Sequence, residues 1–407
     1  MTTEQTAMRD LLRAARGREA EMVRLLGRFV RCESPSYDKA SVDRFGAMVA
    51  SEWRRRGAAV KILNQRLRGD HLLVEMAAGT GRGVVKDHGR GFGRRERRGA
   101  DHGGGQILVL GHLDTVYPIG TIAKMPFRVA GGKAWGPGTF DMKGGLVVAL
   151  AAVDALRTAG VRTRKRVVFL WTSDEEIGSE TSRRAIESEA RRSDAVLVLE
   201  PSLGREGCLK TQRKGVGGAE VIVTGRAAHA GIEPEKGVNA VHELVLQIAR
   251  LMKMNDRARG ITVQATVVEG GTATNVVPER AQASIDIRFA KVADAPRIEK
   301  ELRGLRPILR GARVEVRMGA LRPPLERTAG VRGLFRVARG LMGEMGLSLR
   351  EAATGGGSDG NFTGALGVPT LDGLGAVGDG PHSSREHVVV RELGVRAALL
   401  AGLMARL

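Results

Sequence analysis

The stretch Ile107-Leu-Val-Leu-Gly-His-Leu-Asp-Thr-Val116 joins an unbroken apolar run to a polar ending. Two more apolar runs, Val167-Val-Phe-Leu170 and Ala195-Val-Leu-Val-Leu199, follow along the chain, separated by helical patterns. Strands that are apolar without alternation are buried on both faces, which is typical of a sheet with parallel members covered by helices. The three runs therefore predict an α/β fold with a mixed, mainly parallel sheet.

A second pattern begins after Lys214, where shorter strands alternate with helices. The expected strands are 218–223, 261–268, 281–288 and 313–316, and the expected helices are 239–254 and 295–305. This β-α-β-β-α-β order is that of a split-βαβ, ferredoxin-like unit. We therefore expect an inserted ferredoxin-like domain at 215–325, between two parts of the first domain at 1–214 and 326–407.

Composition narrows the class of protein. The formal net charge is +20, but arginine is spread along the whole chain and only nine Phe, three Trp and two Tyr could stack on bases, so we expect no nucleic-acid partner. No apolar run reaches the roughly 18 residues of a membrane span, and residues 1–16 lack the apolar core of a secretory signal. We therefore expect a cytoplasmic protein without a membrane partner. With only Cys32 and Cys208 present, any metal must be held by histidines and carboxylates.

The stretch from Gly81 to Gly105 is rich in Gly and Arg and has no apolar period. Such a composition cannot bury enough surface to order itself. We interpret it as an exposed, flexible insertion between two strands, with an anionic docking loop as the alternative.

Metal-binding residue types follow the three apolar runs. His112 and Asp114 come after the first run, and residues i and i+2 of an extended segment point the same way, so Asp114 can orient the imidazole. Glu175 and Glu176 come after the second run, and Glu200 ends the third. Because open α/β sheets bind ligands at the carboxyl ends of their strands, these side chains are candidates for one site.

Two further candidates lie outside the apolar runs. Asp141 opens Asp-Met-Lys-Gly-Gly145 just before a long apolar helix, where an aspartate is often only a helix cap. His382 lies in a polar loop, where a single histidine is usually exposed. Taken with the strand-end residues, however, they complete a set without cysteine that suits Zn, Mn or Co. If one ligand bridges, the set suits two ions roughly 3.5 to 4 Å apart.

The chain resembles the M20 metallopeptidases over nearly its whole length, and most closely their glutamate carboxypeptidase (carboxypeptidase G) branch. The motifs that carry the resemblance are, in order, His112-x-Asp114, Asp141-Met-Lys-Gly-Gly, Glu175-Glu176, Glu200-Pro and Gly-x-His382. The resemblance implies a zinc-exopeptidase-type catalytic domain and makes the inserted domain the lid, or dimerisation, domain of a homodimer. Two features depart from the family: the long basic 81–105 stretch, and Arg213-Lys-Gly215, which resembles the deacylase and deacetylase branches.

The resemblance also implies the metal ligands. Asp141 would bridge two divalent ions, with Zn expected first and Co or Mn as alternatives. His112 and Glu200 would sit on different metals, and Glu176 and His382 would complete the two sites. The peptide bond between Asp141 and Met142 would be cis.

Catalytic and substrate-binding roles follow from the same resemblance. Glu175 would be the general base that takes a proton from the metal-bound water, and Asp114 would hold His112. In the inserted domain, His229 would polarise the scissile carbonyl, from its own or the neighbouring subunit. A substrate carboxylate would be bound by the following residues: Asn275, Arg288, Gly356 and Gly357.

We therefore expect an enzyme that hydrolyses an amide bond beside a carboxylate and releases a C-terminal amino acid of the glutamate type. The alternative is an N-acyl amino acid deacylase of the acetylornithine deacetylase or succinyl-diaminopimelate desuccinylase type. A third hypothesis is a metal- or polyanion-binding protein that has lost catalysis. The sequence argues against it, because every expected catalytic position is filled.

Overall fold

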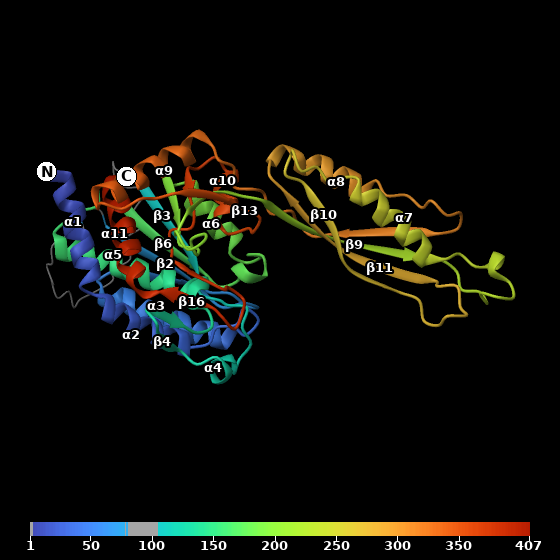
Figure 1. Cartoon of the computed structure of the whole chain (residues 1–407), viewed down its shortest axis with the longest axis horizontal. Helices are drawn as coiled ribbons and strands as arrows, with labels where there is room; N and C mark the ends of the chain where they lie inside the picture. The colour runs from blue at the N-terminus through green and yellow to red at the C-terminus, as the bar shows by residue number, and fades with distance from the viewer. Residues whose placement is uncertain (1–2, 78, 80–104) are drawn as a thin grey trace, which may run out of the picture. The chain divides into compact units, whose positions relative to one another are not determined.

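The computed structural model describes residues 3–77, 79 and 105–407, and the chain divides into two compact units (Figure 1). Unit 1 comprises Met1–Thr211, Arg327–Ala353 and Ser358–Leu407, and unit 2 comprises Gln212–Glu326 and Thr354–Gly357. The Gly/Arg-rich stretch lies outside the described residues up to position 104, so its interpretation stays a prediction.

A mixed, mainly parallel six-stranded sheet forms the centre of unit 1, in the order β1-β2-β6-β3-β7-β14. β3 pairs in parallel with both β6 and β7, and β7 with β14, whereas β1 and β2 are antiparallel additions at one edge. The predicted sheet type is therefore confirmed. The strands are β1 (Ala59–Leu63), β2 (His71–Met76), β3 (Gln106–His112), β6 (Arg166–Thr172), β7 (Ala195–Val198) and β14 (Thr370–Leu371).

Helices cover both faces of this sheet, which is why its central strands are apolar throughout. Ile107 and Val109 of β3 join the larger core, with α5 and α11, whereas Leu108 and Leu110 join a second core with α6 and α10. Every residue of β3 is buried. The helices of unit 1 are α1 (Thr3–Arg16), α2 (Glu19–Arg31), α3 (Lys39–Arg55), α4 (Thr121–Lys124), α5 (Gly144–Ala159), α6 (Arg183–Ala190), α9 (Ala329–Glu344), α10 (Gly360–Ala365) and α11 (Val390–Arg406).

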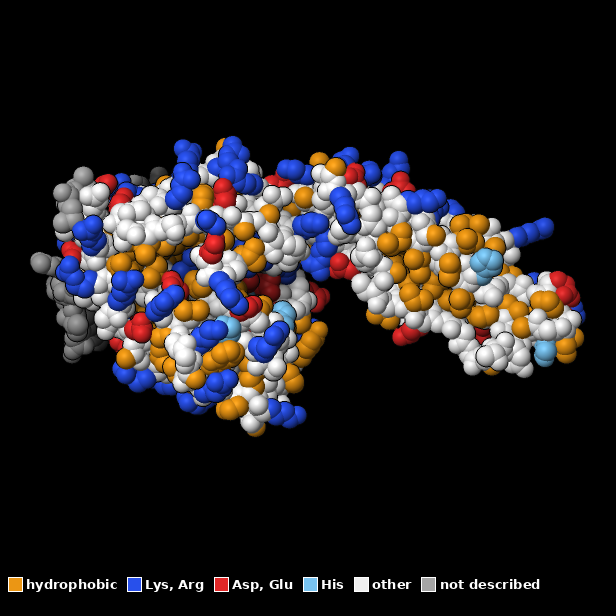
Figure 2. All heavy atoms as spheres, in the orientation of Figure 1, with side chains coloured by type: hydrophobic (Ala, Val, Ile, Leu, Met, Phe, Trp, Pro, Cys, Tyr) orange, Lys and Arg blue, Asp and Glu red, His pale blue; other side chains and the backbone are white. Residues whose placement is uncertain are grey.

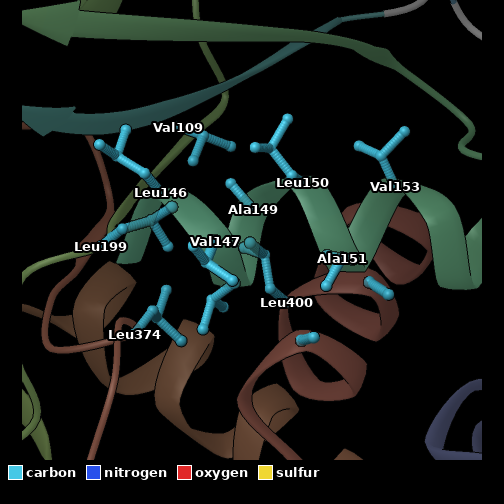
Figure 3. Close-up of a cluster of buried hydrophobic side chains, with 14 of the residues drawn as sticks. Val109, Leu146, Val147, Ala149, Leu150, Ala151, Val153, Leu199, Leu374 and Leu400 are labelled. Atoms are coloured by element: carbon cyan, nitrogen blue, oxygen red, sulfur yellow. The ribbon is translucent and has the colours of Figure 1, made fainter. Parts of the chain in front are cut away.

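Helix α5 is the centre of the larger core. Figure 3 shows Leu146 and Leu150 directed toward Val109 of β3, and Val147 and Leu400 of α11 meeting on the opposite side of the helix. Because α5 is apolar all round, it is buried between the sheet and α11. This packing fixes the start of α5, and with it the segment that carries Asp141.

The strands that belong neither to this six-stranded sheet nor to the sheet of unit 2 form two smaller sheets. One has the order β15-β16-β5-β4, and the other pairs β13 with β8. The first brings the segment after His382 beside the segment before Asp141, because His387 of β16 pairs with Trp135 of β5. The strands are β4 (Arg128–Ala130), β5 (Lys133–Trp135), β8 (Leu209–Arg213), β13 (Glu351–Thr354), β15 (Gly378–Asp379) and β16 (His387–Val389).

Unit 2 is an antiparallel sheet with two helices, and its β-α-β-β-α-β order confirms the ferredoxin-like prediction. The sheet order is β10-β11-β9-β12. Leu244 of α7 and Ile298 of α8 pack with strand residues such as Val221 in a separate core. The elements are β9 (Gly215–Thr224), α7 (Ala240–Met252), β10 (Thr262–Gly270), β11 (Arg280–Phe289), α8 (Ala295–Arg303) and β12 (Arg313–Met318).

Among the described residues, no helix is both long and apolar enough to cross a membrane.

Candidate metal centre

His112 ends β3 and is 2% exposed. Its Nδ1 lies 2.9 Å from the backbone oxygen of Asp114 and 3.5 Å from that residue's Oδ1. With Nδ1–H donating there, Nε2 is left as the ligand atom. That Nε2 lies 3.3 Å from Asp141 Oδ1 and 3.4 Å from Glu200 Oε1. A histidine and two carboxylates thus converge on one position.

Asp141 faces two histidines with its two oxygens. Oδ1 is directed to His112, and Oδ2 lies 3.4 Å from His382 Nε2. The residue sits in a non-helical kink before α5, and the peptide bond that follows it, Asp141–Met142, is cis, in agreement with the expectation. It does not cap α5, whose N-cap position is Lys143 without a side-chain hydrogen bond. Its carboxylate is therefore placed to bridge.

A second group forms around His382. Its Nε2 lies 3.3 Å from Glu176 Oε2 as well as near Asp141. The other oxygen of Glu176, Oε1, is buried and has no hydrogen-bond partner among the described residues. A buried carboxylate oxygen without a donor is costly, and a divalent cation would satisfy it. This observation supports a metal fit independently of the sequence motifs.

The two groups share one member. His112, Asp141 and Glu200 offer ligand atoms within 4.8 Å of one another, and so do Asp141, Glu176 and His382. The expectation that His112 and Glu200 sit on different metals is therefore wrong. The reason is the sheet: β7 pairs in parallel with β3, which brings the end of β7, and Glu200 after it, beside His112.

The charges at this centre are strongly coupled. Burial would lower the pKa of His112, but its carboxylate partners raise it well above its usual value. Hydrogen bonds with Asp141 and Glu176 raise the pKa of His382 to about 10. Burial raises the pKa of Glu176 to about 7. Burial would also raise the pKa of Asp141, but the two histidines hold it well below its usual value. His112, His382 and Glu176 thus tend to keep protons that a divalent cation would displace on binding.

Asp114 holds the adjoining turn as well as His112. Its carboxylate accepts from the backbone N–H groups of Glu175 and Glu176, at 3.3 and 3.2 Å. Ser36 Oγ donates to Asp114 Oδ2 at 2.7 Å. These bonds place Glu175 at the start of a 3₁₀ turn, Glu175–Ile177, one residue from the ligand Glu176. Glu175 therefore lies beside the ligand group that contains Glu176.

Two residues that hold the centre were not found from the sequence. Glu386 is buried, and its carboxylate accepts backbone hydrogen bonds from the segment that ends at Asp141. The hydroxyl of Tyr117 donates to the same carboxylate. A Glu four residues after a candidate metal ligand, His382, was the available signal.

A hollow of about 470 Å³ adjoins the centre within unit 1. Its lining includes Glu176 together with the apolar side chains of Tyr37, Val116 and Ile119. Tyr37 and Ile119 are 75% and 53% exposed. Exposed apolar side chains beside convergent polar groups are common in small-molecule sites, so an apolar part of a substrate fits here.

His229 and Asn275 lie together in unit 2. The backbone N–H of Ala230 donates to Asn275 O at 2.8 Å, and His229 forms a β-bridge with Val276. Both lie in loops that continue from one end of the sheet, where Thr224 pairs with Arg280.

Arg288 lies near the opposite end of β11, the strand that begins at Arg280, and pairs there with Val216 of β9. The eight residue-to-residue steps from Arg280 to Arg288 span about 26 Å at roughly 3.3 Å per step. The carboxylate-binding pair expected from Asn275 and Arg288 therefore does not form within one copy of unit 2.

The glycine loop lies at the Arg288 end of unit 2. Arg288 Nη1 donates to Gly355 O at 3.3 Å, and Arg213 Nη1 donates to Gly356 O and Gly357 O at 3.1 and 2.9 Å. Arg288 also pairs with Asp286 at 2.9 Å. Two guanidinium groups thus hold the loop carbonyls, and the structure brings Arg288, Gly356 and Gly357 together.

Comparisons with known proteins agree with this geometry. The chain is 32% identical over 398 residues to carboxypeptidase G2 of Pseudomonas sp. (strain RS-16), covering 97% of this chain and 91% of the relative. It is 29% identical over 346 residues to a succinyl-diaminopimelate desuccinylase of Stenotrophomonas maltophilia (strain R551-3), covering 80% of this chain and 90% of the relative.

The fold has close neighbours among solved structures. Aminopeptidase PepT from Bacillus cereus ATCC 10987 is similar with a TM-score of 0.74 at 21% identity, over 95% of this chain and 98% of that one. The family model for peptidase family M20/M25/M40 matches residues 108–406. M20 enzymes are dinuclear and metal-dependent, and two ligand groups that share Asp141 suit such a centre. The resemblance drawn from the motifs is confirmed: the chain belongs to peptidase family M20/M25/M40.

Proposed function

We propose that this M20 enzyme hydrolyses an amide bond beside a carboxylate and releases a C-terminal amino acid of the glutamate type. The observation that carries the proposal is the pair of ligand groups joined by Asp141, with Glu175 in the adjoining turn. The substrate class is supported by the likeness to carboxypeptidase G2 and by the Arg288 end of unit 2.

The five ligands would hold two ions, and the donor set favours Zn, with Co and Mn as alternatives. When bound, such ions would lower the pKa of a water and polarise the scissile carbonyl. Glu175 would take a proton from the attacking water, whose oxygen forms the new bond to the carbonyl carbon. Glu175 then gives the proton to the amide nitrogen as the C–N bond breaks. Asp114 would hold His112 and the turn that begins at Glu175 in position during both steps.

A carboxylate of the substrate would lie against Arg288 and the Gly356–Gly357 loop. A guanidinium group can bind a carboxylate through two parallel hydrogen bonds. Arg288 now pairs with Asp286, which substrate would have to share or displace. The hollow lined by Tyr37 and Ile119 would take the acyl part.

His229 and Asn275 would act on the substrate of a second subunit. Support comes from the about 26 Å of strand between their end of the sheet and Arg288, which a small substrate cannot span. Unit 2 also exposes apolar side chains on α7 and on the edge strand β10, at Val245, Met252, Val267 and Val268, and apolar side chains gather on one part of its surface (Figure 2). Such a face suits a homodimer interface.

Mixing two inactive variants tests this arrangement. Glu175→Gln and His229→Ala chains, unfolded and refolded together, should recover about a quarter of wild-type activity, because half the dimers are mixed and each has one intact site. Each variant refolded alone is the control. Recovery no higher than these controls would contradict an exchange of His229 between subunits.

The runner-up keeps the centre and changes the substrate to that of a deacylase. Its support is the desuccinylase relative and the Arg213-Lys-Gly215 motif. Rates on folate and N-acyl glutamates, acetyl-ornithine and succinyl-diaminopimelate, with Zn, Co or Mn added, separate the two. Glutamate release with the highest kcat/KM supports the main proposal. No turnover of any N-acyl amino acid by the metal-loaded protein would refute both.

A cytoplasmic location stays a prediction from the sequence.

A further inference from the structure

The carboxylate of Glu386 is surrounded by donors from the segment that carries Asp141. It accepts from the backbone N–H groups of Gly138, Phe140 and Asp141, at 3.0, 2.7 and 2.9 Å. The residue is completely buried. A buried carboxylate that accepts this many bonds holds its donors firmly, because removing one partner leaves the others unsatisfied.

Tyr117 joins a third segment to the same group. Its hydroxyl donates to Glu386 Oε2 and also lies 3.1 Å from Ser383 O, next to His382. Tyr117 is three residues beyond Asp114, on the segment that follows β3. The Tyr117–Glu386 pair therefore connects the segments that carry His112, Asp141 and His382.

We propose that Glu386 and Tyr117 are positioning residues that set the distance between the two metal positions, by clamping the Asp141 turn to the His382 loop. The inference rests on the proposed two-metal centre and goes beyond its ligands. Asp141 can face both histidines only if its backbone is fixed relative to the His382 loop.

The two positions should not depend equally on this clamp. His112 and Glu200 are fixed by β3 and β7, which are paired along their length. The side chain of His382 is 50% exposed, and the residue lies at φ 59° in the loop between β15 and β16, outside either strand. The ion at the His382 position should therefore be the one that weakens when the clamp is lost.

Stepwise Co²⁺ binding to the metal-free full-length protein tests the proposal, followed by calorimetry and by the absorption spectrum of the bound ion. Glu386→Gln should weaken the binding of Co²⁺ at the His382 position, the second step of the titration, by about 10 to 100-fold. This is the usual effect of removing a group that orients a ligand. Binding of the first Co²⁺, at the His112 position, should stay within about twofold of the wild type. Tyr117→Phe should weaken the same step less. In both variants kcat should fall more than KM rises.

Glu243→Gln is the matched control, because Glu243 is a buried carboxylate of unit 2 that accepts backbone hydrogen bonds from Ile308 and Leu309. It should lower the melting temperature and leave both Co²⁺ affinities unchanged. If Glu386→Gln lowers stability in the same way but binds both ions like the wild type, the clamp is only structural and the proposal is overturned.

Tyr117→Phe, which removes one hydroxyl, decides the matter if Glu386→Gln does not fold: an unchanged second affinity would overturn the proposal. If the second ion weakens as expected but no amide is hydrolysed by the wild type, the clamp stands and the proposed function fails.

Discussion

The metal centre of unit 1 and the substrate-binding candidates of unit 2 differ in how they are built. The five predicted ligands meet within one unit, at the ends of paired strands and in turns held by Asp114 and Glu386. The candidates of unit 2 lie at two ends of one sheet, with His229 and Asn275 in loops at one end and Arg288 within β11 at the other. One copy of the chain thus brings the five candidate ligands together but keeps Asn275 and Arg288 apart in unit 2.

The difference has a physical origin. A metal centre needs ligand atoms fixed within a few tenths of an ångström, which buried strands and hydrogen-bonded turns provide. Substrate binding in a dimer can be divided between subunits, so that the groups are complete only after assembly. If the two regions are separable in this way, substitutions in one should leave the function of the other unchanged.

The largest effect should come from Asp141→Asn. The variant loses the one ligand that both groups share, so both ions should bind weakly. Each ion contributes several kcal/mol to the transition state, and activity should fall by more than about 10³-fold. Metal analysis after dialysis checks the cause, since fewer than two ions per chain should remain. Two retained ions would show that Asp141 does not bridge.

Glu175→Gln should separate chemistry from metal binding. Removing a general base costs about 10² to 10⁴-fold in kcat, while the ligands stay in place. Metal content should remain that of the wild type. Glu180→Gln is the matched control, because Glu180 is an exposed carboxylate in the following turn. Retained activity in Glu175→Gln would exclude Glu175 as the base.

Arg288→Ala should affect substrate binding without affecting the metals. Loss of a charged hydrogen bond of about 1.5 to 3 kcal/mol raises KM for an N-acyl glutamate by roughly 10 to 100-fold. Arg317→Ala is the control, because Arg317 pairs with Glu315 two residues before it, as Arg288 pairs with Asp286. Equal KM values for the two variants would remove Arg288 from the site.

Glu243→Gln should have the smallest effect and be confined to stability. Burial would raise the pKa of Glu243, but hydrogen bonds from Gln247 and two backbone amides hold it below its usual value. The unfolded chain therefore binds the proton more readily, so this stabilisation is present above about pH 4.5 and is lost as pH falls through the folded pKa. Chemical denaturation should show a loss of about 1 to 2 kcal/mol at pH 7 and a smaller difference at pH 4. A constant difference across that range would contradict the assignment.

The sequence predicted the sheet type, the ferredoxin-like unit and the residues that meet at the centre, because each depends on local patterns. An unbroken apolar run such as Ile107–Leu110 is visible without tertiary information. The assignment of His112 and Glu200 to different metals was wrong. Their grouping depends on β7 lying beside β3, and the motifs do not show the order of the strands in the sheet.

The contacts of residues outside the motifs could not be predicted. Glu386 accepts from the backbone of Asp141 across 245 residues of sequence, and its place four residues after His382 does not show that its carboxylate turns inward. Likewise, the motifs that contain Asn275 and Arg288 do not show that the two lie at opposite ends of a sheet.

The most direct test of the two-metal centre is anomalous diffraction from crystals of the full chain loaded with Zn²⁺, measured on both sides of the Zn edge. We expect two peaks roughly 3.5 to 4 Å apart, one touching His112 and Glu200, the other Glu176 and His382, with Asp141 between them. A single peak, or two peaks that do not share Asp141, would contradict it.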